Sequence, residues 1–312
     1  MLVSVVIPLF NKGPYITRTL ESIASQTYTD FEVIVVDDGS TDDGAAQVSR
    51  FPDDRVRVMT QANRGPGHAR NRGVEAARGE LVAFLDADDE WLPSYLAESI
   101  RLLTENPDAA TVSSGYYEMP GGSSTEPMWR NRGIRPGLHR LDPRTDPMLA
   151  VHMLAYMSPW STVARIDALR KHGGFYEKNR CLYGEDAFLW LKVLLNEPVF
   201  FSLNPAVRYH RDASELSSNL AASRPVEPFL SEPEEIERSC PEELKPLLRK
   251  ILAIRAYKTA CILGLWGNWR HAADLRRRFS APVAHTLPYF WASLVCSNPV
   301  GATVGNILYR FR

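Results

Sequence analysis

The stretch Leu81–Trp91 constrains the fold of this chain more than any other part. It opens with a continuous apolar run, Leu81–Leu85, which is typical of a strand buried on both faces of a parallel sheet. Four carboxylates occur within the five positions that follow the run: Asp86, Asp88, Asp89 and Glu90. Because open α/β sheets bind ligands at the carboxyl ends of their strands, this cluster is predicted to lie at a binding site.

Carboxylates this close together repel one another, so the cluster calls for a compensating cation. Mg²⁺ and Mn²⁺ take carboxylate oxygens as ligands and keep coordination positions free for phosphate. The alternative is that the acids only cap the helix expected from about Pro93, where negative charge is favourable. Capping needs only one acid, and the pattern therefore favours a divalent-metal site.

Short apolar runs alternate with helical patterns along the first part of the chain. Val3–Ile7, Glu32–Val36 and Val56–Met59 are predicted strands. A glycine-rich basic loop, 63–73, follows the third of them and leads into a helix. Strand–helix alternation over residues 1–105 predicts a doubly wound, mostly parallel α/β sheet with right-handed crossovers.

The same domain is expected to continue to about residue 220 with a small antiparallel portion. Residues 120–147 are rich in glycine and proline and are predicted to be a long loop or lid. Further along, Val199–Phe201 and Ala206–His210 are predicted to form an antiparallel pair of strands. The α/β domain is thus predicted to span residues 1–220.

The composition changes beyond this domain. Residues 221–236 are predicted to be a proline-rich linker, and 237–312 a basic helical region. From Lys245 to Arg312 there are eleven Lys or Arg residues and one acid, so this region is expected to meet an anionic surface. The aromatic residues around Arg276–Arg278 resemble those of membrane-interfacial segments. The alternative is a cationic helical lid packed on the acidic body.

Several sequence features bear on the compartment. The four cysteines are widely spaced without a CxxC pair, which predicts neither a disulfide framework nor a zinc site and suits a reducing cytoplasm. Met1–Pro8 has no basic leader and is predicted to be a first strand, not a signal peptide. Prolines interrupt the uncharged stretch 279–309, so a membrane-spanning helix is not expected there.

Two more polar residues are expected near the acid cluster. Asp38 ends the second strand, where a carboxylate can accept a hydrogen bond from a nucleobase or a ribose. Arg70 lies in the basic loop and can hold a diphosphate together with a metal. Considered separately, Asp38 would be interpreted as an ordinary turn residue and Arg70 as a surface arginine. Taken together, they favour a nucleoside diphosphate that carries a transferable group.

The second half of the chain offers further candidates. Glu185 and Asp186 open a helix, where they either cap it or supply a general base that accepts the proton of an attacking hydroxyl. His210 is either a core histidine or a contact to the metal or the leaving phosphate. Trp160 is either a core residue or an aromatic platform for a sugar.

Five segments, taken together, resemble the family-2 nucleotide-sugar glycosyltransferases of the GT-A fold in order and spacing. They are residues 5–11, 33–41, 69–73, 84–91, which carries a DXD pattern, and 184–187. The resemblance covers residues 3 to about 210 and does not extend to the basic tail.

The resemblance implies roles on the donor side of a site. Pro8, Phe10 and Asp38 would surround the nucleotide base, with Arg70 nearby. Asp86 would lie by the ribose and the metal.

The resemblance also implies roles for the metal and the acceptor. Asp88 would bind Mn²⁺ or Mg²⁺, with Asp86 and His210 as further candidate ligands. Asp186 would be the catalytic base. Two residues are assigned to the acceptor side, Glu185 and Trp160.

The activity implied is inverting transfer of a sugar, most readily from a UDP-sugar, to the hydroxyl of a carbohydrate or lipid-linked acceptor. Such enzymes assemble cell-surface polysaccharides or glycolipids, here in the cytoplasm or at the cytoplasmic face of the inner membrane, with no nucleic-acid partner. The chain lacks the Gln-x-x-Arg-Trp segment, which argues for a non-processive enzyme.

Other classes fit less well. A sugar-phosphate nucleotidyltransferase expects a glycine-rich, arginine-bearing first loop, and Pro8–Gly13 is not one. A dinucleotide dehydrogenase would need G-x-G-x-x-G after the first strand. A non-catalytic sugar- or nucleotide-binding module leaves the acid cluster without an explanation.

Overall fold

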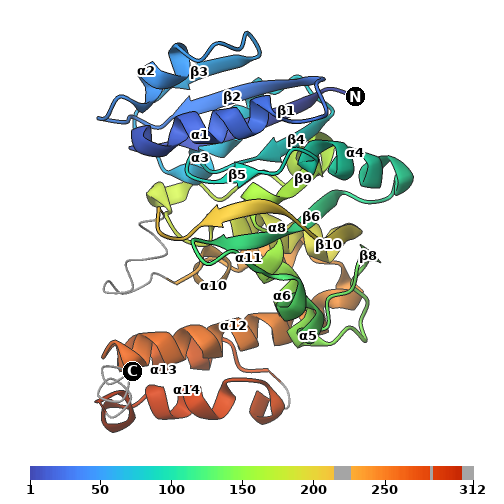
Figure 1. Ribbon diagram of the computed structural model, residues 1–312. Coiled ribbons are helices and arrows are strands. Elements are labelled where there is room, and N and C mark those ends of the chain that lie inside the picture. Colours follow the sequence, from blue (N-terminus) through green and yellow to red (C-terminus); the bar gives the residue numbers. More distant parts are fainter. Residues whose placement is uncertain (214–225, 282–283, 304–312) are drawn as a thin grey trace. The chain divides into compact units, whose positions relative to one another are not determined.

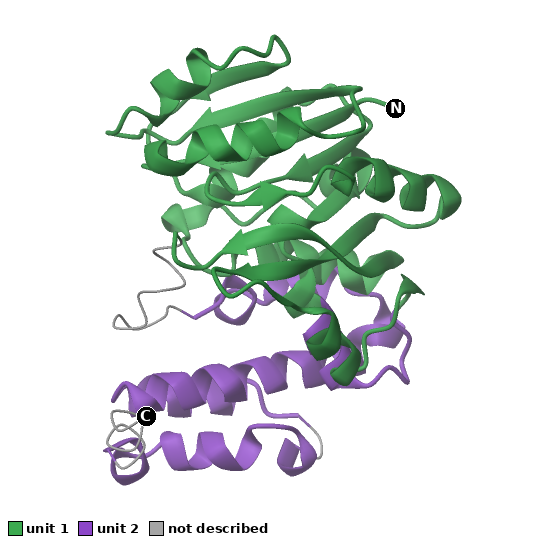
Figure 2. Ribbon diagram, in the orientation of Figure 1, with its two compact units in different colours: residues 1–140, 154–218 green, residues 141–153, 219–312 purple. Residues whose placement is uncertain are grey.

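The computed structural model describes residues 1–213, 226–281 and 284–303. The chain divides into two compact units, coloured separately in Figure 2. Unit 1 comprises residues 1–140 and 154–218, and unit 2 comprises residues 141–153 and 219–312. Unit 2 therefore takes in one short segment from the middle of the chain as well as the basic tail.

Unit 1 is built on a ten-stranded sheet in the part of the chain that the structure describes (Figure 1). The strand order is β3 (Val56–Thr60), β2 (Phe31–Asp37), β1 (Val3–Leu9), β4 (Leu81–Phe84), β9 (Thr162–Arg165), β6 (Thr111–Met119), β10 (Val199–His210) and β5 (Glu90–Trp91). Two short strands lie off this path, with β7 (Ser123–Ser124) on β6 and β8 (Gly137–His139) on β10.

The sheet is mostly parallel. β1 pairs in parallel with β2 and β4, β2 with β3, and β6 with β10. β9 is inserted antiparallel between β4 and β6, and β5, β7 and β8 are also antiparallel. The predicted fold class, a doubly wound, mostly parallel sheet with a small antiparallel portion and C-terminal helices, is confirmed.

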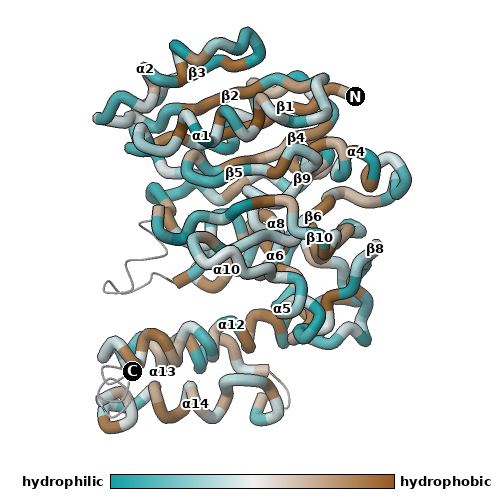
Figure 3. Tube along the Cα trace, in the orientation of Figure 1, coloured by the Kyte–Doolittle hydropathy of each residue, from teal (hydrophilic) through white to brown (hydrophobic). Residues whose placement is uncertain are grey.

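The core of unit 1 lies along the first strands. Every residue of β2 is buried, and Val3 of β1 lies between Phe31 and Leu81 in the ladder. Figure 3 shows the hydrophobic course of β1 and β2. A run that is apolar at successive positions can be satisfied only when both faces of the sheet are covered, which is why these runs become central strands.

Helices connect these strands. They are α1 (Gly13–Ala24), α2 (Gly44–Ser49), α3 (Pro66–Ala76), α4 (Tyr95–Glu105), α5 (Glu126–Asn131), α6 (Pro147–Tyr156), α7 (Ile166–Lys171) and α8 (Glu185–Asn196), with 3₁₀ turns η1 (Pro159–Ser161) and η2 (Lys178–Arg180). Ile16, Leu20 and Ile23 of α1 are all buried, because their spacing of three to four residues places them on one helical face. Figure 1 shows α1 lying across β1 and β2.

The structure corrects the predicted strand pair near residue 200. Val199–Phe201 and Ala206–His210 are parts of one continuous strand, β10, which pairs in parallel with β6. The predicted antiparallel pair was wrong because the register shifts on either side of Pro205, which makes a bulge inside the strand and not a turn.

The structure also corrects the predicted long loop, because 120–147 contains β7, α5 and β8. Trp129 of α5 is fully buried, with ring centroids 4.7 Å from Tyr156 and 5.9 Å from Phe201. Ile134 and Leu141 are buried as well, but the spacing of these three positions follows neither a helical nor a strand period.

Unit 2 is helical where the structure describes it. Its elements are α10 (Pro228–Ser231), α11 (Glu234–Ser239), η3 (Glu242–Leu244), α12 (Lys245–Leu265), α13 (Trp269–Arg278), η4 (Ala284–Thr286) and α14 (Phe290–Cys296). Residues 221–225 of the predicted linker lie outside the described residues, and the rest of it holds α10 and the start of α11. Tyr257 of α12 and Phe290 of α14 pack with ring centroids 5.5 Å apart. Among the described residues, no helix has both the length and the apolar character needed to span a bilayer.

Candidate active site

A cavity of about 380 Å³ lies in unit 1 at the carboxyl ends of β1, β2 and β4. Nine of the ten predicted site residues line it, although they come from distant parts of the sequence. They are Pro8, Phe10, Asp38, Arg70, Asp86, Asp88, Trp160, Glu185 and Asp186. The parallel strands end at one edge of the sheet, and the segments that follow them are therefore brought together there.

Phe10 and Asp38 form one side of this cavity. Phe10 is 45% exposed, which leaves an aromatic face open to a planar ligand. Asp38 is buried and organises the neighbouring loop, because its Oδ1 accepts hydrogen bonds from Gln61 Nε2 at 2.7 Å and the Arg64 amide at 2.8 Å. Its Oδ2 accepts from the Gly65 amide at 2.8 Å. Three of its roughly four acceptor positions are thus occupied by the protein.

Arg70, on α3, is buried beside the cavity and joins two acids. Its Nη2 donates to Asp86 Oδ1 at 2.8 Å and its Nη1 to Glu185 Oε1 at 2.8 Å. Burial by itself lowers the pKa of Arg70, but the two acids outweigh burial and raise it. The guanidinium therefore stays charged and ties the end of β4 to the start of α8.

The other members of the acid cluster also have partners from the protein. Lys12 Nζ lies 2.8 Å from Asp88 Oδ2. Glu90 Oε1 is 2.7 Å from His210 Nε2 and 3.3 Å from Arg18 Nε. Charge compensation therefore does not by itself require a metal at this cluster, contrary to the reasoning from the sequence.

A divalent ion nevertheless fits the carboxylates that face the cavity. Asp86 and Asp88 both line it, with side chains 30% and 10% exposed, and a site of one or two carboxylates completed by phosphate is typical of Mg²⁺. Burial, with the nearby charge of Asp86, raises the pKa of Asp88, and the contact with Lys12 acts against this shift. No group of three or more His, Cys, Asp or Glu residues in the described chain is arranged to hold a metal without such help.

His210 is the predicted site residue that does not line the cavity. Its amide donates to Asp89 Oδ1 at 2.8 Å, and its ring faces Glu90, with Asp212 Oδ1 4.0 Å from Nδ1. The structure therefore pairs this histidine with acids that do not line the cavity, and its contact with a metal stays a prediction.

Glu185 and Asp186 occupy the first turn of α8, directly after Gly184, whose φ of 74° suits a residue without a Cβ atom. Glu185 forms an ion pair with Arg70. Burial together with the charge of Asp186 raises the pKa of Glu185 to about 7. Asp186 Oδ1 accepts a local hydrogen bond from the Ala187 amide. Burial raises the pKa of Asp186, so the carboxylate that faces the cavity is a stronger base than a solvated one.

Trp160 belongs both to the core and to the cavity wall. Its ring stacks on Tyr209 at 4.9 Å with an interplanar angle of 3°, and its carbonyl accepts a hydrogen bond from Trp91 Nε1 at 2.9 Å. The indole is thus held rigidly where it lines the cavity.

Reasoning from the sequence missed several cavity residues. They include Lys12, Asn63, Arg180 and Leu182. Arg180 Nη2 donates to Asn63 Oδ1 at 2.7 Å, across 117 positions of the chain. Such residues lie in loops without periodicity, so no local pattern marks them. Lys12 and Asn63 had a positional signal, since each follows a parallel strand by three residues.

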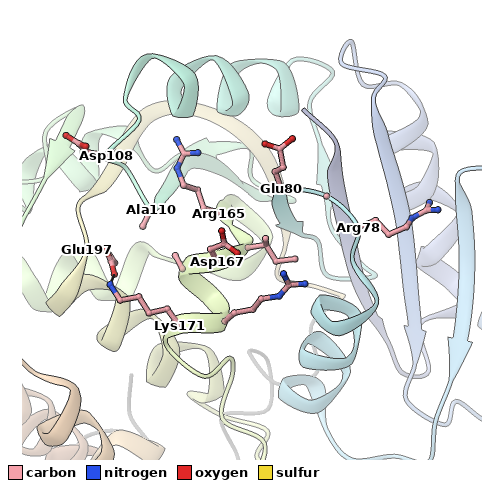
Figure 4. A pocket seen from close by; sticks show the side chains of 12 residues that line it. Arg78, Glu80, Asp108, Ala110, Arg165, Asp167, Lys171 and Glu197 are labelled. Atoms are coloured by element: carbon pink, nitrogen blue, oxygen red, sulfur yellow. Dashed lines mark hydrogen bonds and ion pairs between the residues drawn. The ribbon is translucent and has the colours of Figure 1, made fainter.

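A second cavity in unit 1, of about 510 Å³, lies at the opposite edge of the sheet (Figure 4). It is lined by Glu80 before β4 and by Arg165, where the antiparallel strand β9 ends. Lys171 lies 2.6 Å from Glu197, and Arg165 donates to two backbone carbonyls. The lining carries charges of both signs, and none of the predicted site residues belongs to it.

The fold and the position of the cavity are those of an α/β protein that binds its ligand at the carboxyl ends of parallel strands. The sequence profile of Glycosyl transferase family 2 matches residues 4–161, about half of the chain. This chain therefore belongs to glycosyl transferase family 2.

Two curated relatives illustrate the similarity. Glycosyltransferase GlyG of Streptococcus pneumoniae is 39% identical over 119 residues, which cover 37% of this chain and 39% of that protein. The UDP-Glc:alpha-D-GlcNAc-diphosphoundecaprenol beta-1,3-glucosyltransferase WfgD of Escherichia coli is 35% identical over 124 residues, 39% of this chain and 48% of that protein. The matches thus span between a third and a half of the relatives' length.

Solved structures show the same fold across most of the chain. TarS residues 1–349 of S. aureus in complex with UDP-GlcNAc superimposes with a TM-score of 0.63 at 18% identity, covering 95% of this chain and 90% of that chain. The mannosyltransferase PcManGT of Pyrobaculum calidifontis, in complex with GDP-Man and Mn²⁺, gives 0.56 at 20% identity, with coverages of 98% and 86%.

Proposed function

We propose that this chain is a non-processive, inverting glycosyltransferase that moves a sugar from a nucleoside diphosphate, UDP in the first instance, to an acceptor hydroxyl. The observation that carries the proposal is the cavity at the strand ends, which holds an open aromatic face, two metal-competent carboxylates and a buried base. Family membership and the sugar-nucleotide complexes of the structural neighbours support it.

The donor would bind along the ends of β1, β2 and β4. Phe10 offers its exposed ring to the base, and the loop that Asp38 organises closes the side of the base site. Asp88, with Asp86, would hold Mn²⁺ or Mg²⁺, which when bound neutralises the negative charge that develops on the departing diphosphate.

The acceptor would enter on the side of α8. Asp186 takes the proton from the acceptor hydroxyl at its carboxylate oxygen, and Trp160 provides a flat apolar wall for a sugar ring. Glu185 keeps Arg70 in place beside both groups. A base on the face opposite the leaving group makes direct displacement the simplest course, and the anomeric centre is then inverted.

The test is release of UDP or GDP from a panel of nucleotide sugars, with Mn²⁺, on glycan and lipid-diphosphate-linked acceptors. Release that depends on one donor and on the acceptor supports the proposal. Tight binding of a nucleotide sugar with no turnover on any acceptor would instead favour a non-catalytic binding module.

We also propose that unit 2 docks on an anionic membrane, where a lipid-linked acceptor would be presented. Nine large apolar side chains of the described residues are exposed, and five of them lie between positions 289 and 300. Trp291 and Val295, one helical turn apart on α14, are 65% and 56% exposed. The excess of basic residues in the tail complements anionic lipid, and the relative WfgD is named for a diphosphoundecaprenol-linked acceptor.

The arginine triplet contributes less to this surface than its sequence suggests. Arg276 lies over the rings of Tyr257 and Phe290, at 5.9 and 5.2 Å, and Arg278 pairs with Glu234 at 3.1 Å. The apolar side chains of α14 are therefore the proposed anchor, with the remaining basic residues adding electrostatic attraction.

Flotation with anionic vesicles tests this docking. The full chain should float, and a Trp291→Ser, Val295→Ser double variant should bind on the order of tenfold more weakly, since two inserted apolar side chains are lost. Leu138→Ser is the matched control, because it removes a similarly exposed apolar side chain from unit 1. A full chain that stays with the unbound fraction would contradict membrane docking.

A further inference from the structure

Lys12 and Asp88 form an ion pair inside the candidate donor cavity. Lys12 Nζ lies 2.8 Å from Asp88 Oδ2, and the same ammonium donates a hydrogen bond to the carbonyl oxygen of Ala213 at 2.6 Å. Both charged residues line the cavity. The side chain of Lys12 is 20% exposed, and that of Asp88 10%.

This ammonium contacts one oxygen of the carboxylate that would bind a divalent ion. An ion bound to Asp88 would lie about 2.1 Å from a carboxylate oxygen, and the like-charged Lys12 cannot remain at 2.8 Å from that carboxylate without strong repulsion. Lysine carries a compact charge on a flexible stem, so it can leave the carboxylate without movement of the backbone.

The other cations of the cluster are less free to move. Arg70 is buried between two acids, with its side chain 6% exposed. Arg18 holds the Asp88 carbonyl oxygen at 2.8 Å as well as Glu90. Lys12 combines a flexible stem, partial exposure and direct contact with a cavity carboxylate.

We propose that Lys12 is a tethered competitor of the divalent ion at Asp88, which couples metal binding to nucleotide binding. Without nucleotide, the ammonium holds Asp88 and weakens binding of the metal. A bound diphosphate offers the ammonium another anionic partner, and Asp88 becomes available to the ion. This inference rests on the proposed function, because it requires a diphosphate and a metal in this cavity.

The coupling is measured by titrating Mn²⁺ into the full chain by calorimetry, with and without UDP. For the unmodified chain, UDP should raise the affinity for Mn²⁺, and by linkage Mn²⁺ should raise the affinity for UDP by the same factor. In Lys12→Met, Mn²⁺ alone should bind on the order of tenfold more tightly, because a unit charge next to the ligand oxygen is gone. The factor by which UDP raises the affinity of this variant for Mn²⁺ should therefore be smaller than in the unmodified chain.

Two variants serve as controls. Lys12→Arg keeps the positive charge and should bind Mn²⁺ alone as weakly as the unmodified chain. Lys171→Met removes the lysine of a similar ion pair, 2.6 Å from Glu197 in the second cavity, and should leave all Mn²⁺ affinities unchanged.

The outcomes separate this inference from the proposed function. If the unmodified chain binds Mn²⁺ and UDP cooperatively but Lys12→Met binds Mn²⁺ alone with unchanged or lower affinity, the inference is overturned and the proposed function stands. If the unmodified chain binds Mn²⁺ equally well with and without UDP, the inference is overturned whether or not the variants fold. If the unmodified chain binds neither Mn²⁺ nor UDP, both the inference and the proposed function are overturned.

Discussion

Asp186 is the residue on which the proposed chemistry depends most directly. Asp186→Asn should leave UDP binding within about twofold but lower turnover on the order of a hundredfold or more, because the amide cannot accept the acceptor's proton. Calorimetry with UDP and a UDP-release assay measure the two effects. Asp167→Asn removes an exposed acid at the second cavity and should change neither. Unchanged turnover in Asp186→Asn would remove this residue from the mechanism.

Asp88 is expected to act on binding and not on proton transfer. Asp88→Ala should abolish the part of UDP affinity that depends on Mn²⁺, because the proposed ligand oxygen is lost. UDP titrations with and without Mn²⁺ measure that difference, and circular dichroism confirms folding. Metal-dependent UDP binding of full strength in the variant would mean that the ion is held elsewhere.

Glu185 gives stability a defined pH dependence. Burial, reinforced by Asp186, raises the pKa of Glu185 from 4.5 to about 7. Between these values the folded protein binds more protons than the unfolded chain, so the free energy of unfolding should fall as the pH rises. Asp186, Asp88 and Asp89, whose pKa values are also raised by burial, act in the same direction.

Glu185→Gln should therefore lose less stability than the unmodified chain between about pH 5 and pH 7, because the replacement does not ionise. Melting temperatures at several pH values over this range measure the difference in slope. Glu98→Gln is the control, since its hydrogen bond with Arg101 lowers the pKa of Glu98 and it is already ionised over this range. Equal slopes in Glu185→Gln and the unmodified chain would contradict the assignment.

At the scale of elements, α5 depends on a single side chain. Trp129→Ala should lower the free energy of unfolding by about 3–5 kcal/mol, because a fully buried indole is replaced by a cavity. Trp291→Ala removes an indole that is 65% exposed and should change the free energy of unfolding by no more than about 0.5 kcal/mol. Denaturant titrations compare the two, and a small effect at Trp129 would mean that α5 is not anchored by it.

Elements with a strong periodic or continuous apolar pattern were predicted closely. β2 and β3 extend no more than one residue beyond the predicted runs Glu32–Val36 and Val56–Met59, and β1 extends two residues beyond Val3–Ile7. β10 was not predicted, because Asn204–Pro205 breaks the apolar pattern and only pairing with β6 carries the strand through that break. Local sequence records propensity, whereas the partner strand supplies the hydrogen bonds that override it.

For the whole molecule, UDP with Mn²⁺ should raise the melting temperature, because a ligand that binds only the folded state stabilises it by about 2.7 kcal/mol at a hundred times its dissociation constant. Thermal unfolding with UDP, with Mn²⁺ and with both tests this. Asp88→Ala should lose the additional shift due to Mn²⁺. No shift at saturating concentrations would argue against a nucleotide site in this chain.

The sequence by itself determined the fold class and indicated nine of the residues that line the candidate cavity, because buried parallel strands must be continuously apolar and their ends must meet at one edge. Only the tertiary structure decided how the charges are paired. The sequence suggested that the acids around Asp88 need a metal ion to compensate their charge. In the folded chain, Arg70 pairs with Asp86 and Lys12 pairs with Asp88. The ion pair of Arg70 with Glu185 joins residues 115 positions apart, and no local pattern encodes which side chains will meet across such a distance.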